Sequence, residues 1–241
     1  MTYYYEFVYP EGEFPVKAKI HSVDEIELHW HKQVEFILVL EGTVNIRLGQ
    51  KKYLLQTGDF IFVNSNEVHN TFKTEEQNLL LAVQINPAFY AFIYPNFTDF
   101  YFDCNSFGQN DAVLHRHANI RKYLARISWE ISRRQTGFRS RIGSYLFLLA
   151  GELIAFPFYN KADLDNAISD EDLNRLQRIT NYIEQHLHRK LTLQEIGEEE
   201  HLSYYYLSHF IKDKMGISFQ EYLKKTRMQR AVELLLSSEK A

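Results

Sequence analysis

Up to about residue 86, apolar positions fall in short runs with polar turns between them. Residues 44–48 alternate apolar and polar side chains, as expected for a strand with one buried face. The apolar run at residues 34–40 predicts a buried strand, and residues 41–42 predict a turn after it. Further strands are expected at 53–56, 59–63 and 79–85. Closely spaced strands with polar turns favour a small antiparallel barrel or sandwich.

After residue 111 the apolar spacing becomes that of helices. One helix is expected over about 116–135, and a second from Phe138 to near Pro157. The second carries an apolar stripe that includes Leu146 and Leu153. This stripe either packs on its own domain or pairs two subunits, so a homodimer is one expectation.

Residues 158–170 are polar and lack periodicity, which predicts a linker. The chain after it is expected to be helical. The sequence therefore predicts an α+β protein with a first domain over residues 1–157 and an all-α second domain over residues 171–241.

The second domain contains several residues that typically begin or end helices. A hydroxyl followed three positions later by glutamate forms a capping box, and glycine ends a helix in the left-handed conformation. These positions are Thr192 with Glu195, Ser203, Gly216, and Ser218 with Glu221. Two short helices joined by a tight turn, and then a long helix, are typical of a DNA-reading module.

The outward face of the second short helix carries polar and aromatic side chains. Candidates for contacts to base edges are Tyr205, Ser208, His209 and Lys212, and candidates for contacts to phosphates include Lys212, Lys224 and Arg227. The formal net charge of −4 gives no preference for nucleic acid over the whole chain. A helical bundle with a solvated lysine face is the alternative.

The string LTLQEIGEEEHLSYYYLSHFIKDKMGISFQEYLKKTRMQRAVELL resembles the AraC/XylS family of bacterial transcription regulators. The resemblance implies two helix-turn-helix units joined by a long helix, with the second helix of the first unit in the major groove. Gly197 replaces the usual small alanine, and Glu200 replaces an apolar residue. The family continues into a second unit, whereas this chain stops at Ala241, so truncation after the first unit is expected.

The stretch HWHKQVEFILVLEG places His29, His31 and Glu35 at the same strand parity, so an unbroken strand would direct all three to one face. This stretch resembles the first cupin motif, and GDFIFVNSNEVH resembles the second, in which His69 matches. Regulators of the AraC/XylS family commonly carry a cupin-like sensor barrel at the N-terminus. The resemblance thus implies a cupin-like antiparallel β-barrel, here with a helical layer.

Three interpretations of the cluster His29, His31, Glu35 and His69 remain open. It could bind a small polar effector such as a sugar, hold zinc, manganese, iron or nickel, or form a structural network. We expect a DNA-binding regulator rather than an enzyme, with no obligatory cofactor. The alternative is a metal-dependent cupin enzyme with a helical appendage.

Two further properties bear on where the protein acts. The chain has one cysteine, Cys104, which favours a reducing cytoplasm over a disulfide-rich setting. Its longest apolar stretch is interrupted and too short for a bilayer, so no membrane partner is expected.

Overall fold

The computed structural model describes residues 4–6, 8, 15–91, 93–107, 114–160 and 171–238. Contacts divide the chain into a larger unit, Phe14–Leu164, and a smaller unit formed by Met1–Glu13 with Asp165–Ala241. The first residues of the chain thus group with the C-terminal helices. The division after Leu164 falls within the expected linker, of which residues 161–170 lie outside the described part.

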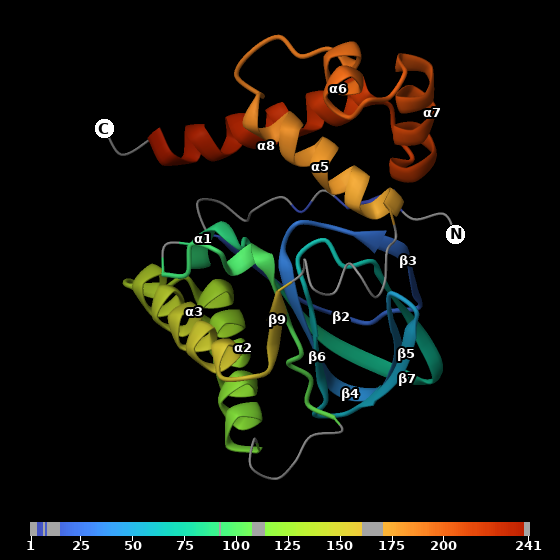
Figure 1. Cartoon of the computed structure of the whole chain (residues 1–241). Helices are drawn as coiled ribbons and strands as arrows, with labels where there is room; N and C mark the ends of the chain where they lie inside the picture. The colour runs from blue at the N-terminus through green and yellow to red at the C-terminus, as the bar shows by residue number, and fades with distance from the viewer. Residues whose placement is uncertain are drawn as a thin grey trace. The chain divides into compact units, whose positions relative to one another are not determined.

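The larger unit is built on antiparallel strands (Figure 1). Its strands are β2 (Val16–His21), β3 (Glu25–Trp30), β4 (Val34–Leu48), β5 (Lys51–Gln56), β6 (Phe60–Val63), β7 (His69–Ile85), β8 (Phe100–Phe102) and β9 (Phe158–Asn160). The C-terminal half of β7 pairs with β2 and with the first half of β4, which also pairs with β6. The N-terminal half of β7 pairs with β3 and with the second half of β4, which also pairs with β5.

The two halves of this sheet share one apolar interior. Ile37 and Val39 from the first half of β4 cluster with Val44 and Ile46 from its second half. Among the described strands the hydrogen-bonded pairings do not close into a ring, so the expected barrel is not confirmed.

The turn predicted at residues 41–42 is wrong. β4 continues through this point and bends, with shifts of register between Val39 and Glu41 and between Gly42 and Val44. Gly42 has a φ of +74°, and a Cβ there would lie 1.8 Å from the backbone oxygen of Gln77. The glycine therefore serves a bend within one strand, because the apolar segments on both sides of it pair with β7.

Two helices cover the outer face of the sheet half that is formed by β2, β6, the first half of β4 and the C-terminal half of β7. Figure 1 shows the two helices side by side. They are α2 (Leu114–Arg133) and α3 (Phe138–Ile154), close to the predicted bounds, and a short helix α1 (Ala88–Ala91) and a 3-10 turn η1 (Phe97–Asp99) precede them. Leu146 and Leu153 are fully buried in this core together with Phe36 and Phe60. The proposed pairing of subunits through these two leucines is therefore wrong, because the apolar outer face of the sheet already takes up the stripe.

Part of the expected linker is a strand. β9, at the start of that segment, pairs with β8 in a two-stranded sheet. The pairing brings the ring of Phe158 within 4.9 Å of the ring of Phe100, centroid to centroid. Aromatic contacts across the strands stabilise such short pairs, which explains why residues 158–160 form a strand.

The smaller unit contains a short strand and four described helices. They are β1 (Tyr4–Tyr5), α5 (Glu171–Gln185), α6 (Leu193–Glu199), α7 (Tyr204–Met215) and α8 (Phe219–Ser238). The predicted caps are present: the hydroxyls of Thr192, Ser203 and Ser218 accept from the amides of Glu195, Tyr206 and Glu221, each at 3.2 Å. Gly216 ends α7 with a φ of +71°. No helix in the described ranges has the length and apolarity needed to cross a bilayer.

The two departures from the family pattern both have local roles. Gly197 accepts a hydrogen bond from the amide of Leu202 at 2.7 Å, and a Cβ on Gly197 would lie 2.6 Å from the Leu202 oxygen. The glycine therefore permits the tight turn between α6 and α7. Glu200 accepts from Arg178 of α5 at 2.8 Å, so an ion pair tethers that turn where an apolar contact was expected.

Candidate functional site

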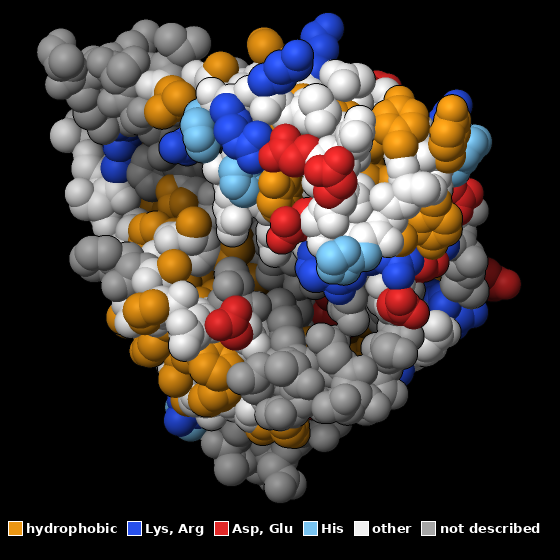
Figure 2. Space-filling view, turned by 45° about the horizontal axis from the view of Figure 1, so that its top comes forward, with side chains coloured by type: hydrophobic (Ala, Val, Ile, Leu, Met, Phe, Trp, Pro, Cys, Tyr) orange, Lys and Arg blue, Asp and Glu red, His pale blue; other side chains and the backbone are white. Residues whose placement is uncertain are grey.

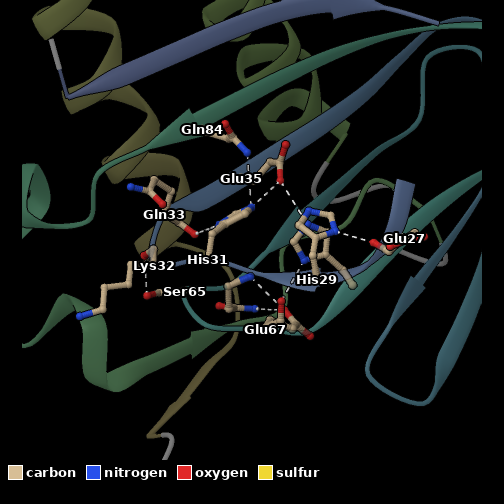
Figure 3. A network of polar contacts seen from close by, with 11 residues as sticks. Glu27, His29, His31, Lys32, Gln33, Glu35, Ser65, Glu67 and Gln84 are labelled. Carbon is tan, nitrogen blue, oxygen red and sulfur yellow. Dashed lines mark hydrogen bonds and ion pairs between the residues drawn. The ribbon is translucent and has the colours of Figure 1, made fainter. Parts of the chain in front are cut away.

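Four polar side chains of the larger unit meet at one place between the strands, and Figure 3 labels three of them, His29, His31 and Glu35. His29 lies near the end of β3, Glu35 lies near the start of β4, and His69 begins β7. The condition of an unbroken strand from 29 to 35 is not met, because β3 ends at Trp30 and residues 31–33 lie between β3 and β4. The cluster still forms because His29 pairs directly with His69 across the two strands.

All four side chains are buried and in contact. The Nε2 atom of His31 lies 3.0 Å from Oε2 of Glu35, and Nε2 of His69 lies 3.3 Å from the same oxygen. The rings of His29 and His69 lie 4.1 Å apart, centroid to centroid. The structure therefore brings together all four residues that the sequence pointed to, around one carboxylate.

Backbone carbonyls hold the three imidazole rings in one tautomer. The Nδ1 atoms of His29, His31 and His69 lie 2.8, 3.0 and 2.9 Å from the carbonyl oxygens of Glu27, Gln33 and Glu67. A carbonyl only accepts, so each Nδ1 carries the proton and each Nε2 is left to face the centre. An Nε2 atom can then approach Glu35 favourably only as an imidazolium, or with a cation placed between them.

Burial and the shared carboxylate perturb the ionisation of this cluster. Burial, helped by the charges of His69 and His31, lowers the pKa of His29 to about 3. Burial acts to raise the pKa of Glu35, but its hydrogen bonds with His31 and His69 outweigh this, and the pKa lies below its usual range. Burial acts to lower the pKa of His69, whereas the contact with Glu35 raises it more. Glu35 is therefore the stable negative charge of the site.

The donor set fits a divalent transition metal. One ring nitrogen from each of the three histidines lies within 4.8 Å of the others. Imidazole with a carboxylate suits zinc, iron, manganese and nickel, and a carbonyl on the far nitrogen is a common support for a metal-bound histidine. The residues that would hold such an ion are His29, His31, His69 and Glu35.

Several residues of the site were missed from sequence. The Nε2 atom of Gln84 lies 3.4 Å from the Nε2 atom of His31. The carboxylate of Glu67 accepts from Tyr101 at 2.9 Å and from the amide of Asn64 at 2.9 Å. Gln84 had a usable signal, because it is a polar residue at the inward parity of an otherwise apolar strand. Tyr101 had none, because it comes from β8, far along the chain.

The residues predicted to contact DNA lie on helices α7 and α8. Tyr205 has 78% of its surface exposed, and His209, Lys212 and Lys224 are also exposed. Ser208 is half-buried beside them. On the opposite face of α7, Leu207, Phe210 and Ile211 are buried, as the spacing predicts.

Arg227 has a structural contact in the smaller unit. Its guanidinium donates to the backbone oxygens of Leu187 at 3.2 Å and Arg189 at 2.6 Å. These bonds cap carbonyls just after α5, while the side chain stays exposed. A contact between Arg227 and a phosphate therefore remains a prediction.

Comparisons with known proteins cover both units of the chain. Residues 11–84 match the family model described as Cupin domain, so this part of the chain is a cupin-type β-sheet domain, and with its helices the protein is α+β. The chain is 23% identical over 237 residues to the uncharacterized HTH-type transcriptional regulator YdeC of Bacillus subtilis (strain 168), covering 92% of this chain and 79% of YdeC. It is 24% identical to the probable transcriptional regulator LumQ of Photobacterium leiognathi, covering 92% of this chain and 82% of LumQ.

Other matches cover less. An uncharacterized HTH-type transcriptional regulator of Staphylococcus aureus (strain MRSA252), SAR0107, is 22% identical over 80% of this chain, which spans only 25% of that protein. Among solved structures, a cupin-2 domain protein from Shewanella frigidimarina is 22% identical over 30% of this chain and 71% of its own, with a TM-score of 0.28. Oxalate decarboxylase of Bacillus subtilis is 20% identical over 30% of this chain and 22% of its own, also with a TM-score of 0.28.

Proposed function

We propose that the chain is a ligand-responsive, DNA-binding transcription regulator of the AraC/XylS type. Its larger unit binds a small polar effector at the cluster of His29, His31, Glu35 and His69, and its smaller unit binds DNA through α7. One observation carries the proposal: a capped helix–turn–helix with a polar and aromatic outer face occurs in the same chain as a buried polar cluster. The names of YdeC and LumQ support it.

The outer face of α7 has the side chains that DNA recognition needs. Tyr205, Ser208 and His209 supply groups that can reach base edges, and Lys212 and Lys224 supply cations for phosphates. Figure 2 shows Lys and Arg side chains interspersed with Asp and Glu on the face in view. Binding by such a mixed surface depends on a few placed contacts rather than on total charge.

Effector control requires that the ligand distinguish two arrangements of the protein. A ligand with equal affinity for both would shift nothing, however tightly it bound. We propose that the effector favours one arrangement and so alters DNA affinity, and by reciprocity DNA alters effector affinity.

The regulator function is tested by DNA binding of the whole chain. We expect salt-dependent affinity for the DNA upstream of its own gene, and we expect Lys212→Ala to reduce the salt slope by about 1. His209→Ala should change the base preference more than the overall affinity. Lys122→Ala, on an exposed part of α2, is the matched control and should change neither. Fluorescence anisotropy at several salt concentrations measures both, and affinity that is absent or independent of salt would contradict the proposal.

Pairing of two copies is also proposed, through a different face of α3 from the one first expected. Phe147 and Leu148 are 42% and 47% exposed, and the ring of Phe147 stacks on that of Phe89 at 4.9 Å between centroids. If this face pairs subunits, Leu148→Asp should yield a monomer by light scattering, while the unfolding midpoint changes little. Ser144→Asp tests the same exposed face with a smaller change. A wild-type chain that is already monomeric at high concentration would refute this pairing.

The convergent Nε2 atoms favour a second candidate, a metal-dependent cupin enzyme. A bound ion would supply a Lewis acid or activate a water molecule. The chain's own groups would fix its position through the three carbonyl-held imidazoles and the Glu35 carboxylate.

Metal analysis separates this candidate from a metal-free sensor. Protein purified without chelators should contain about one equivalent of metal if the site is a metal centre, and His31→Ala should lower that content at least tenfold. His188→Ala, in the smaller unit, is the control and should leave it unchanged. A metal-free wild-type protein that also fails to take up added zinc would remove the enzyme interpretation.

A further inference from the structure

Strand β2 carries three basic or polar side chains at alternate positions; Lys17 and His21 are partly buried, and Lys19 is exposed. The register pairs Lys17 with Gln84, Lys19 with Ala82 and His21 with Leu80, and directly paired residues point to the same side of a sheet. Leu80 belongs to the interior cluster. The alternate residues of β2, Val16 and Ala18, pack in the core beneath α2 and α3 instead.

This row of side chains continues directly into the polar cluster. Gln84 pairs with Lys17 on one side and with Glu35 on the other, so the three stand in one line across β2, β7 and β4. Gln84 also contacts His31. Burial lowers the pKa of His21, and the charge of Lys19 lowers it further, while a backbone hydrogen bond with Lys19 and the charge of Glu35 act to raise it.

The charges on this face do not balance. The Glu35 carboxylate is in contact with His31 and His69. Within the described ranges, no ion pair or hydrogen bond is found for the ammonium groups of Lys17 and Lys19. Two cations therefore stand beside a site whose carboxylate is already neutralised.

Protection of a sheet edge is the competing explanation. β2 pairs with β7 on one side only, and inward lysines on an edge strand discourage association with other chains. That explanation accounts for a lysine anywhere along β2. It does not account for the alignment of Lys17 with Gln84 and Glu35 across three strands.

We propose that the effector of the larger unit carries a carboxylate or phosphate group, which Lys17 and Lys19 bind while Gln84 and the histidine cluster contact its uncharged polar part. The proposal rests on the effector-binding function proposed above and narrows it to anionic metabolites. Lysine is well suited to this role, because its ammonium is a compact charge with three donors that adapts to carboxylate or phosphate oxygens.

Calorimetry on the full chain with matched probes tests this inference. The probes are D-glucose, D-glucuronate, D-glucose 6-phosphate and inorganic phosphate, so the same ring is compared without charge, with a carboxylate and with a phosphate. We expect at least one anionic probe to bind roughly tenfold or more tightly than glucose. Lys17→Gln with Lys19→Gln should abolish this advantage, and Lys17→Arg with Lys19→Arg, which keeps both charges, should retain most of it.

The control pair is Lys51→Gln with Lys52→Gln, two exposed lysines on β5. It removes the same charge from the chain and should leave anion binding unchanged. Glucose binding as tight as the anionic probes, or an equal loss in the control pair, would overturn the inference. So would the absence of binding by every anionic probe at about 10 mM.

The DNA-binding assay distinguishes failure of this inference from failure of the regulator function. Salt-dependent DNA binding without any anion binding leaves the regulator standing and removes the anionic effector. Lysine-dependent anion binding by a chain that does not bind DNA upholds the anion site and removes the regulator.

Discussion

Gly42→Ala is expected to destabilise the larger unit by about 3 kcal/mol or more, which is among the largest effects of a single substitution. The added Cβ would lie 1.8 Å from the Gln77 oxygen, and the φ of +74° is itself unfavourable for alanine. Relief requires the bend of β4 to open, which separates the two sheet halves that share one interior. Urea unfolding followed by circular dichroism measures the loss.

Gly151→Ala provides the matched control. Gly151 lies within α3, and a Cβ there meets no atom within 4 Å. Alanine favours helix over glycine, so this variant should gain about 0.5–1 kcal/mol. If Gly42→Ala unfolds at the wild-type urea concentration while Gly151→Ala shifts as expected, the close approach at the bend does not exist in solution.

His31→Ala combined with His69→Ala should cost about 3–5 kcal/mol in the presence of a chelator, because it leaves the Glu35 carboxylate buried without a partner. Both histidines contact the same oxygen of that carboxylate. Adding Glu35→Leu to the double variant should recover much of the loss, since an apolar side chain needs no partner in this interior. The free energy of unfolding from urea titrations measures both steps.

His29→Ala is the internal comparison for that experiment. His29 stacks near His69, but no ion pair joins it to Glu35 among the contacts of the described residues. Its removal should therefore cost less than removal of the pair. The contrary result is that the double variant with Glu35→Leu added proves no more stable than the double variant of His31 and His69 itself. That result would show that the Glu35 carboxylate is solvated or protonated in solution and is not a buried charge.

Much of the smaller unit could be predicted from sequence, because its signals are local. The side chains of Thr192, Ser203 and Ser218 act on amides three residues later, and Gly216 ends a helix by its own conformation. The capping box at Thr192 and Glu195 is only half confirmed, because the prediction that the Glu195 side chain returns to the cap is wrong. Its carboxylate pairs with Arg189 and Tyr182 rather than with the cap, because these partners come from the preceding helix and the loop after it.

The larger unit was harder to predict, because its decisive contacts join distant segments. The sequence identified His29, His31, Glu35 and His69 from motifs alone. It could not show that Gly42 bends a strand instead of turning the chain, since a positive φ suits both. The position of Lys17 on the inner side of β2 could not be predicted either. That side is defined only by pairing with β7, in which the partner of Lys17 lies 67 residues further on.

Strand β7 limits how this protein can change. Its inner face supplies His69 and Gln84, and its outer face supplies Leu81, Val83 and Ile85 to the core beneath the helices. An insertion of one residue within the paired segment 79–85 of β7 would exchange its two faces and damage the polar cluster and the core together. New ligand specificities can therefore arise by substitution at the inner positions of β7, whereas changes of length are confined to the irregular segment 74–77 and the loops at its ends.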